Sequence, residues 1–368
     1  MKLAIIGASY LQQPLVQKAK EIGLYTLCFA WSEGAVCKDA VDEFYPISVM
    51  EKEQILTICQ EKQIDGICTI ASDVAAPTVA YVAEKMRLIG NSYKTAVRAN
   101  NKFLMRNVFA KGGIPCPNYS VVTSVDQTTM NYSFPLIVKP TDRSGSLGIT
   151  KIERSEDFIP AIENALNCSF NHEAIVEEFV EGREISVEFI SYRGKHYPLQ
   201  ITDKVTSDEP HFVELEHHQP ADLSNDQYEE IYALTERALN ALGITNGASH
   251  SEYKITNDGR IFVMEIGARM GGDFIGSDLV QLSTGYDYLK GVIEVALGTF
   301  NEPVFGERHY AGVYFLCEET RRLLTTINTS SLPQIVRAKV TDDKLRYVKC
   351  SADRSGYLIY QSDKKIAL

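Results

Sequence analysis

The sequence predicts an α/β unit at the N-terminus joined to a larger α+β region. Over about the first ninety of the 368 residues, short apolar runs alternate with helical stretches. This alternation is typical of a parallel sheet with helices on its faces. From about residue 134 the strand-like runs are joined by tight turns, which is typical of antiparallel hairpins. A chain of this length can form two or three packed subdomains with an ample core.

The N-terminal unit is expected to be mainly structural. Strands are expected at residues 3–7, 25–30, 66–71 and 87–90, and helices at residues 12–22, 52–62 and 73–86. The turn after the first strand reads Gly-Ala-Ser-Tyr, so the GxGxxG fingerprint of dinucleotide-binding folds is absent there. This disfavours an NAD-dependent oxidoreductase, for which fold analogy alone would be a weak argument.

A subdomain junction is expected after the next helix. Ser92 can cap a long helix that reaches about Ala110. The glycine pair at 112–113, with Pro115 and Pro117 beyond it, is a helix stop signal. The chain is therefore expected to leave the N-terminal unit at this point.

The part beyond the junction is expected to be α+β. Strands are expected at residues 135–140, 149–152, 174–179 and 184–191. Ser224 and Gln227 form a capping box at the start of an amphipathic helix, which Gly243 ends. After about residue 305 the chain has strand-like and loop segments without an assignable motif.

A predicted hairpin around residues 257–260 brings two carboxylates together. Its Asp-Gly centre favours a two-residue type I′ turn, in which the numbers of cross-strand partners sum to about 517. Glu252 then lies directly opposite Glu265. The other face is expected to carry the apolar residues Tyr253, Ile255, Phe262, Met264 and Ile266.

This carboxylate pair has two interpretations. Directly opposed like charges destabilise a sheet, and a divalent cation such as Mg²⁺ between them removes the repulsion. The alternative is a solvated pair of surface glutamates, and a one-residue slip of register would separate them. Residues 267–273 place Arg269 and several glycines at the same strand end, which favours the metal site.

A second segment has the character of a phosphate-binding site. Lys139 ends a predicted strand, and the Gly/Ser-rich loop 144–148 follows. The lysine could reach a phosphate and the loop amides could surround its oxygens. A Walker loop is absent, because GxxxxGK[ST] does not occur there and a strand follows rather than a helix. An ordinary turn beside an exposed lysine is the competing interpretation. The acidic run 177–184 is likewise either an adenosine clamp or a solvated edge.

Composition argues against several classes of protein. The formal net charge of −11 argues against nucleic acid as a partner, because phosphate binding needs a basic surface. We expect no membrane span, since no segment is long and apolar enough, and no signal peptide. The eight cysteines are spread without a CxxC spacing, which is typical of reduced thiols in a cytoplasmic protein.

In order along the chain, these motifs resemble the ATP-grasp superfamily. The resemblance covers roughly residues 1–300. It rests on Asn-Lys at 101–102, Gly-Ile-Pro-x-Pro at 113–117, Ile-Val-Lys-Pro at 137–140, Glu-Glu-Phe-Val-Glu-Gly-x-Glu at 177–184, His-Ser-Glu at 250–252 and Met-Glu-Ile-Gly-Ala-Arg at 264–269. Each motif is modest, but the ordered set at these spacings is quite specific.

The resemblance implies a domain organisation. A Rossmann-like preATP-grasp domain is expected at residues 1–95 and the ATP-grasp domain at residues 96–305. The latter would comprise a lid subdomain at about 115–180 and a catalytic subdomain. Residues 306–368 are expected to pack on the ATP-grasp core.

The resemblance also implies roles for individual residues. Those that would bind ATP are Lys102 and Lys139 at the phosphates, Ser144, Gly145, Ser146 and Gly148 in the loop over them, Glu177, Glu178 and Val180 at adenine, and Glu184 at the ribose. Glu252 and Glu265 would hold Mg²⁺ or Mn²⁺. Arg269 would hold the substrate carboxylate or the acyl-phosphate, so that Arg269 and Lys139 are the expected catalytic residues.

The chain departs from the family pattern at two positions. Gly267 stands where many members have an asparagine, which puts a third metal ligand in doubt, and Asn101 stands where the family has an aspartate. The variant at 265–272 looks most like the amino-acid ligase branch. Within that branch, the residues that suggest a substrate-side segment are Asp203, Lys204, Phe212, Val213, Glu214, His217 and His218.

The expected function is that of a carboxylate–amine ligase. ATP would convert a small carboxylic acid, foremost an amino acid, into an acyl-phosphate that an amine attacks. Two alternatives stay open: activation of bicarbonate in a carboxylase-like or carbamoyl-phosphate-like reaction, and nucleotide binding without turnover, which Gly267 motivates. The expected partners are the small-molecule acid and amine, and relatives suggest a homodimer.

Overall fold

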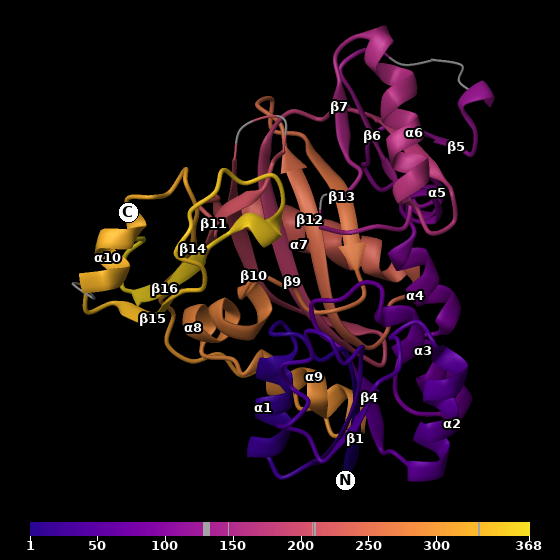
Figure 1. Ribbon diagram of the computed structural model, residues 1–368, viewed down its shortest axis with the longest axis vertical. Coiled ribbons are helices and arrows are strands. Elements are labelled where there is room, and N and C mark those ends of the chain that lie inside the picture. The colour runs from indigo at the N-terminus through magenta and orange to yellow at the C-terminus, as the bar shows by residue number, and fades with distance from the viewer. Residues whose placement is uncertain (128–132, 146, 208, 210, 330–331) are drawn as a thin grey trace.

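The computed structural model describes residues 1–127, 133–145, 147–207, 209, 211–329 and 332–368 (Figure 1). Within this part of the chain the strands form three sheets. A parallel sheet holds the N-terminal strands, a long antiparallel sheet occupies the centre, and a small antiparallel sheet lies apart at the opposite end of the molecule from the N-terminus.

The N-terminal sheet is parallel, as the alternating pattern predicts. Its strands are β1 (Lys2–Ile6), β2 (Tyr25–Phe29), β3 (Glu43–Tyr45) and β4 (Gly66–Cys68), in the order β3-β2-β1-β4. Its helices are α1 (Gln13–Glu21), α2 (Lys52–Lys62) and α3 (Ala76–Met86). The expected strand at 87–90 is wrong, because Arg87 takes a left-handed conformation that ends α3 and leads into a turn. The edge strand β3 is only three residues long and half-buried, so no alternation reveals it.

The single helix expected from Ser92 to about Ala110 is two helices, α4 (Tyr93–Asn100) and α5 (Lys102–Lys111). Asn101 between them has extended backbone angles, and its side chain accepts a hydrogen bond from the amide of Leu104 at 2.9 Å. An asparagine side chain can replace the helical hydrogen bonds of the first turn in this way, so it favours a cap over a helix interior. As a result, Lys102 becomes the first residue of a new helix.

The small sheet has the order β5-β8-β6-β7, and all its pairs are antiparallel. Its strands are β5 (Tyr119–Val122), β6 (Leu136–Pro140), β7 (Thr150–Ile152) and β8 (Ala174–Glu178). The helix α6 (Phe158–Cys168) covers one face and forms a separate hydrophobic core with it. Strand β6 ends at the Lys139-Pro140 pair, so Lys139 lies where the strand leads into the following loop.

The central sheet is antiparallel throughout, in the order β13-β12-β9-β10-β11-β14-β16-β15. Its strands are β9 (Arg183–Tyr192), β10 (Lys195–Thr206), β11 (Glu214–Gln219), β12 (Gly247–Ile255), β13 (Ile261–Gly267), β14 (Tyr310–Leu316), β15 (Ile335–Val340) and β16 (Gly356–Ser362). The expected capping box starts α7 (Asn225–Leu242), whose apolar face packs on this sheet, and Gly243 ends it. The shorter helices are α8 (Val280–Thr284) and α10 (Leu323–Thr329). The part of the chain without a recognisable motif therefore extends the same sheet as the motif-bearing strands.

The hairpin β12–β13 places Glu252 opposite Glu265, as predicted, but in a different way. The turn encloses three residues, since Thr256 and Arg260 close it, so pairs such as Ile255–Ile261 sum to 516 and the predicted register near the turn is wrong. A bulge beside Glu252 then shifts the register by one and restores the carboxylate pair.

The bulge also changes which side chains reach the core. Ile261, Val263 and Ile266 are buried, whereas Phe262 and Met264 are only half-buried on the other face, contrary to the prediction. A glycine in the left-handed region at 259 is typical of such three-residue turns.

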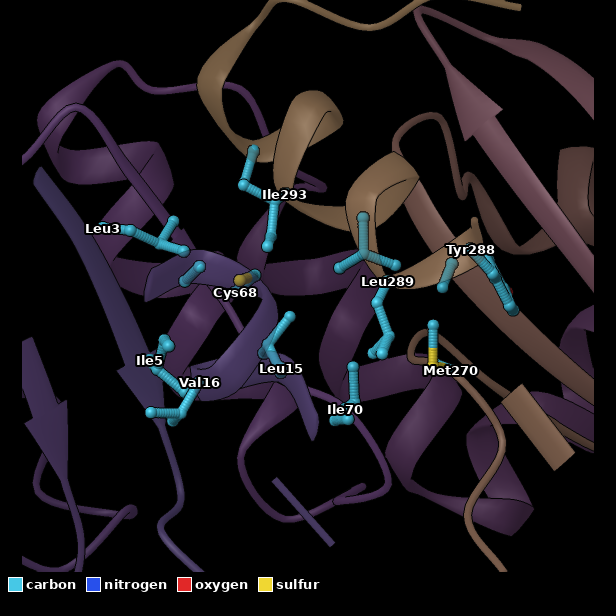
Figure 2. Packing of buried hydrophobic residues seen from close by; sticks show 14 of the residues in the cluster. Leu3, Ile5, Leu15, Val16, Cys68, Ile70, Met270, Tyr288, Leu289 and Ile293 are labelled. Carbon is cyan, nitrogen blue, oxygen red and sulfur yellow. The ribbon is translucent and has the colours of Figure 1, made fainter. Parts of the chain in front are cut away.

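A shared hydrophobic core joins the N-terminal sheet to the central one (Figure 2). Leu289 and Ile293 of α9 (Tyr288–Leu297) pack against the N-terminal residues Leu15 and Cys68 in this cluster. A backbone hydrogen bond extends this contact between the two units: the amide of Ala71, next to Ile70, donates to the carbonyl of Met270 at 3.1 Å. The two units are thus held in register directly beside the segment that carries Arg269.

None of the helices in the described part of the chain has both the length and the apolarity that a membrane crossing requires.

Truncation of the shared core should destabilise the chain. Ile293 is fully buried, and Ile293→Ala is expected to lower the free energy of unfolding by about 2–5 kcal/mol, because it removes buried methyl groups and leaves a cavity. Ile159→Ala on α6 is the matched control. The Ile159 side chain is 40% exposed, so this substitution should lower the free energy of unfolding much less. Urea denaturation of both variants checks this, and an equal cost would contradict the assignment of the core.

Candidate functional site

A cleft in two connected lobes lies between the small sheet and the central sheet. The larger lobe has a volume of about 200 Å³ and borders Val180 and Glu184. The smaller, of about 130 Å³, borders Asp73 and Arg269. The residues that line both lobes are Lys102, Lys139, Ile149, Glu214, Glu252 and Glu265. Because these residues are shared, the two lobes form one continuous cleft.

Most of the predicted site residues line this cleft. Those are Lys102, Lys139, Ser144, Gly145, Glu177, Glu178, Val180, Glu184, Glu252, Glu265 and Arg269. Gly148 is not among the lining residues. Its φ is +74°, and a Cβ there would come within 2.9 Å of Pro140 and Cys168, so only glycine fits this turn. Ser146 lies outside the described residues.

A buried charge triad fixes Lys139 at the cleft. The Glu177 carboxylate lies 2.6 Å from Arg106 Nε and 2.6 Å from Lys139 Nζ, and Arg106 and Glu177 are almost completely buried. Burial alone would raise the pKa of Glu177, but the two cations outweigh this and lower it to about 2. The carboxylate is therefore ionised at neutral pH and serves to hold the lysine.

Two lysines neutralise the opposed carboxylates. Lys102 Nζ lies 3.0 Å from Glu265 and Lys204 Nζ lies 2.6 Å from Glu252, at a point where both glutamates face the cleft. Lys204 also lies 3.4 Å from Glu214. Burial lowers the pKa of Lys204, but the glutamates around it raise it above its usual range.

The carboxylate pair has the donor set that Mg²⁺ prefers. Among the described residues there is no group of three or more acidic, histidine or cysteine side chains that could hold a metal. Mg²⁺ is usually bound by one or two carboxylates together with nucleotide phosphates and water, rather than by a full protein cage. Glu252 and Glu265 on neighbouring strands fit that arrangement.

Arg269 is held by a residue of the N-terminal unit. Its guanidinium makes two hydrogen bonds to Asp73, at 2.8 and 2.7 Å, and both side chains are mostly buried. A Cβ at Gly267 would lie 2.7 Å from the Asp73 carboxylate and 3.1 Å from Arg269 Nε. Gly267 is therefore what leaves room for this ion pair.

A third acidic group, Glu188, lies behind the opposed carboxylate pair. Glu188 is fully buried and contacts His250, whose other ring nitrogen lies 3.3 Å from Glu252. Burial alone would lower the pKa of His250, but Glu188 and Glu252 outweigh it and raise the pKa to about 9. The imidazole is thus positively charged between two carboxylates at neutral pH.

Several residues of this site were missed by reasoning from the sequence: Asp73, Arg106, Glu188 and the pairing role of Lys204. Arg106 lies one helical turn after Lys102, and this spacing was an available signal. Glu188 alternates with apolar residues along β9, a pattern that ordinarily indicates a solvated face, although Glu188 is buried. Asp73 offered no signal, because its partner lies almost two hundred positions away.

The predicted substrate-side segment divides between two places. Lys204, Phe212 and Glu214 line the cleft. His218 instead bonds to Tyr360 at 2.9 Å and is buried against the C-terminal strands.

Residues 132–278 match the family model described as an ATP-grasp domain. The alanine–anticapsin ligase of Bacillus subtilis (strain 168) is 28% identical over 263 residues, which cover 62% of this chain and 55% of that protein. The D-alanine–D-alanine ligase of Aromatoleum aromaticum is 26% identical over 212 residues, which cover 54% of this chain and 65% of that protein. The chain thus spans little more than half the length of the alanine–anticapsin ligases that it matches.

The fold resemblance to solved structures extends over the whole chain. The L-amino acid ligase from Bacillus licheniformis superimposes with a TM-score of 0.81 at 22% identity, covering 99% of this chain and 93% of that one. The phosphoribosylglycinamide synthetase from Anaerococcus prevotii gives 0.78 at 21% identity, covering 99% and 94%. These matches confirm the fold class predicted from the sequence.

The charge triad predicts a pH-dependent stability. Glu177→Gln should lower the free energy of unfolding by about 3–5 kcal/mol at neutral pH, because it leaves two buried cations without their partner. The depressed pKa of Glu177 stabilises the fold above pH 4.5, and this contribution is lost as the pH falls towards 2. The difference between variant and unmodified protein should therefore shrink below pH 4.5 in urea titrations. Glu163→Gln, on the exposed side of α6, should show no such dependence.

Proposed function

We propose that this chain, whose residues 132–278 match the ATP-grasp domain, is an ATP-dependent ligase that activates a small carboxylic acid as an acyl-phosphate and joins it to an amine. The observation that carries the proposal is the continuous cleft. In it, two lysines, an opposed carboxylate pair and Arg269 lie in the order that a nucleotide, its phosphates and an acyl group would require.

The larger lobe is proposed as the nucleotide site. Lys102 and Lys139 would contact the phosphates, with Ser144 and Gly145 in the loop over them. The main chain at Glu178 and Val180 would contact adenine, and Glu184, which now pairs with Lys254 at 2.8 Å, would bind the ribose hydroxyls. Glu177 acts through Lys139 in this assignment, because its carboxylate is already paired with two cations.

Glu252 and Glu265 are the proposed ligands of Mg²⁺. When bound, the ion neutralises phosphate charge and orients the terminal phosphoryl group. The lysines that now pair with the two carboxylates, Lys204 and Lys102, lie where they could turn to a phosphate or a substrate instead.

The reaction is proposed to occur in the smaller lobe. A carboxylate oxygen of the substrate attacks the γ-phosphorus, the bond to the β–γ bridging oxygen breaks, and ADP leaves. The amine nitrogen then attacks the acyl carbon, releases phosphate and loses a proton, which gives the amide. Arg269 would hold the carboxylate and then the acyl-phosphate, and Asp73 fixes its guanidinium for this task.

An amino acid is the proposed carboxylate donor. The relatives include ligases named for alanine, for D-alanine and for L-amino acids. The smaller lobe offers both charges that an amino acid would need, namely the arginine for its carboxylate and the acidic side chains of Asp73 and Glu214 for its ammonium group.

The test is release of ADP and phosphate from ATP and Mg²⁺ against a pairwise panel of amino acids and small carboxylic acids, with bicarbonate as a separate arm. Release that requires both an acid and an amine is the expected result. Release with bicarbonate alone would contradict the ligase and favour the carboxylase-like alternative. ATP binding without release across the panel would favour a non-catalytic binder. Glu265→Gln serves as the inactive control. Near-normal turnover in this variant would contradict the assignment of Glu265 as a metal ligand.

Arg269→Ala should separate chemistry from nucleotide binding. We expect kcat to fall by about 10²–10³-fold, as for removal of a group that stabilises charge developing in the transition state. The dissociation constant of ATP, measured by calorimetry, should stay near that of the unmodified protein, because Arg269 lines only the smaller of these two lobes. Loss of ATP affinity would contradict the carboxylate role.

A further inference from the structure

We propose that Glu188 and His250 are positioning residues that hold the metal ligand Glu252 and the loop after Arg269 in one fixed arrangement. This inference rests on the proposed function, because it assigns Glu252 to the metal. It concerns one side chain on β9 and one on β12. Neither takes part as a reactant in the proposed reaction.

Glu188 is committed to two partners at once. Its side chain is fully buried, and one carboxylate oxygen accepts a hydrogen bond from the Gly271 amide at 3.0 Å. The other oxygen contacts Nδ1 of His250, which lies directly across from it in the β9–β12 pairing. Burial of a carboxylate costs free energy of folding unless the group is paired and hydrogen-bonded. Glu188 therefore depends on both partners staying in position.

His250 passes this constraint on to the metal site. It lies two residues before Glu252 on the same strand and therefore on the same face. Its Nε2 is 3.3 Å from the Glu252 carboxylate, while its Nδ1 is held by Glu188. A group that bonds to a metal-binding carboxylate restricts its orientation, and loss of such partners typically weakens metal binding.

The main chain near Arg269 depends on the same carboxylate. A Cβ at Gly271 would lie 2.6 Å from a Glu188 oxygen and 2.8 Å from His250 Nδ1, so only glycine lets this segment approach. Gly271 follows Arg269 by two residues, and the intervening Met270 packs in the core shared with the N-terminal unit. Glu188 therefore ties the proposed metal site to the proposed acyl site through one buried group.

A purely structural role is the alternative explanation, and metal affinity separates the two. Substitution of a merely structural pair would change stability but not the affinity for a cation. The probe is Mn²⁺ with ADP, followed by electron paramagnetic resonance on the full chain. ADP affinity without metal and the unfolding temperature report separately on the fold.

Two substitutions at position 250 test the two contacts of His250 separately. Asparagine places its amide near the position of Nδ1 and can keep the contact with Glu188, but it does not reach Glu252. Glutamine places its amide near the position of Nε2 and can keep the contact with Glu252. We expect His250→Asn to weaken Mn²⁺ binding by about 10–100-fold, with metal-free ADP affinity unchanged, and His250→Gln to weaken it much less.

A control histidine lies on β10, the strand that pairs with β9. His196 is buried and bonds to Ser191 at 2.7 Å, and it lines neither lobe of the cleft. His196→Asn should leave the Mn²⁺ affinity unchanged, whatever its effect on stability.

The outcomes distinguish the inference from the function on which it rests. Equal Mn²⁺ affinity in His250→Asn and the unmodified protein would overturn the inference and leave the proposed function standing. Absence of Mn²⁺ binding in the unmodified protein would overturn the metal assignment itself. Glu188→Gln, which is nearly isosteric, provides a second variant and should also weaken Mn²⁺ binding.

Discussion

Electrostatic repulsion between Glu252 and Glu265 is the constraint around which the cleft is organised. The β12–β13 bulge places these two carboxylates directly opposite each other. Like charges in that position destabilise a sheet. Lys102 from the start of α5 and Lys204 from β10 compensate for this from distant parts of the chain, and His250 lies beside Glu252 on the same strand. The two carboxylates are thus neutralised by groups of the chain itself.

The second organising contact joins the N-terminal unit to the smaller lobe of the cleft. Asp73 follows the last strand of the parallel sheet, and its carboxylate holds Arg269 through two hydrogen bonds. The N-terminal unit therefore does more than support the fold, which is how its sequence alone was interpreted. The same contact explains Gly267, because any side chain there would meet the ion pair.

Other parts of the fold show how long-range pairing overrides local pattern. The segment from Ser92 to Ala110 has a continuous helical pattern, yet Asn101 divides it, because its side chain satisfies the amide of the next helix. The register of the β12–β13 hairpin near its turn was mispredicted by one residue. The bulge shifts the register back by one residue, so the two carboxylates pair as predicted.

Sequence pattern alone was sufficient to predict the parallel N-terminal sheet, the capping box at Ser224, the class of the fold and the opposition of Glu252 and Glu265. These features depend on neighbouring residues or on short motifs, whose preferences are written locally. Only the tertiary structure revealed the pairs Asp73–Arg269, Arg106–Glu177 and Glu188–His250, together with the strands β14 to β16 that extend the central sheet. Each of these joins side chains or strands that lie far apart along the chain, and a local pattern carries no information about which distant group will neutralise a buried charge.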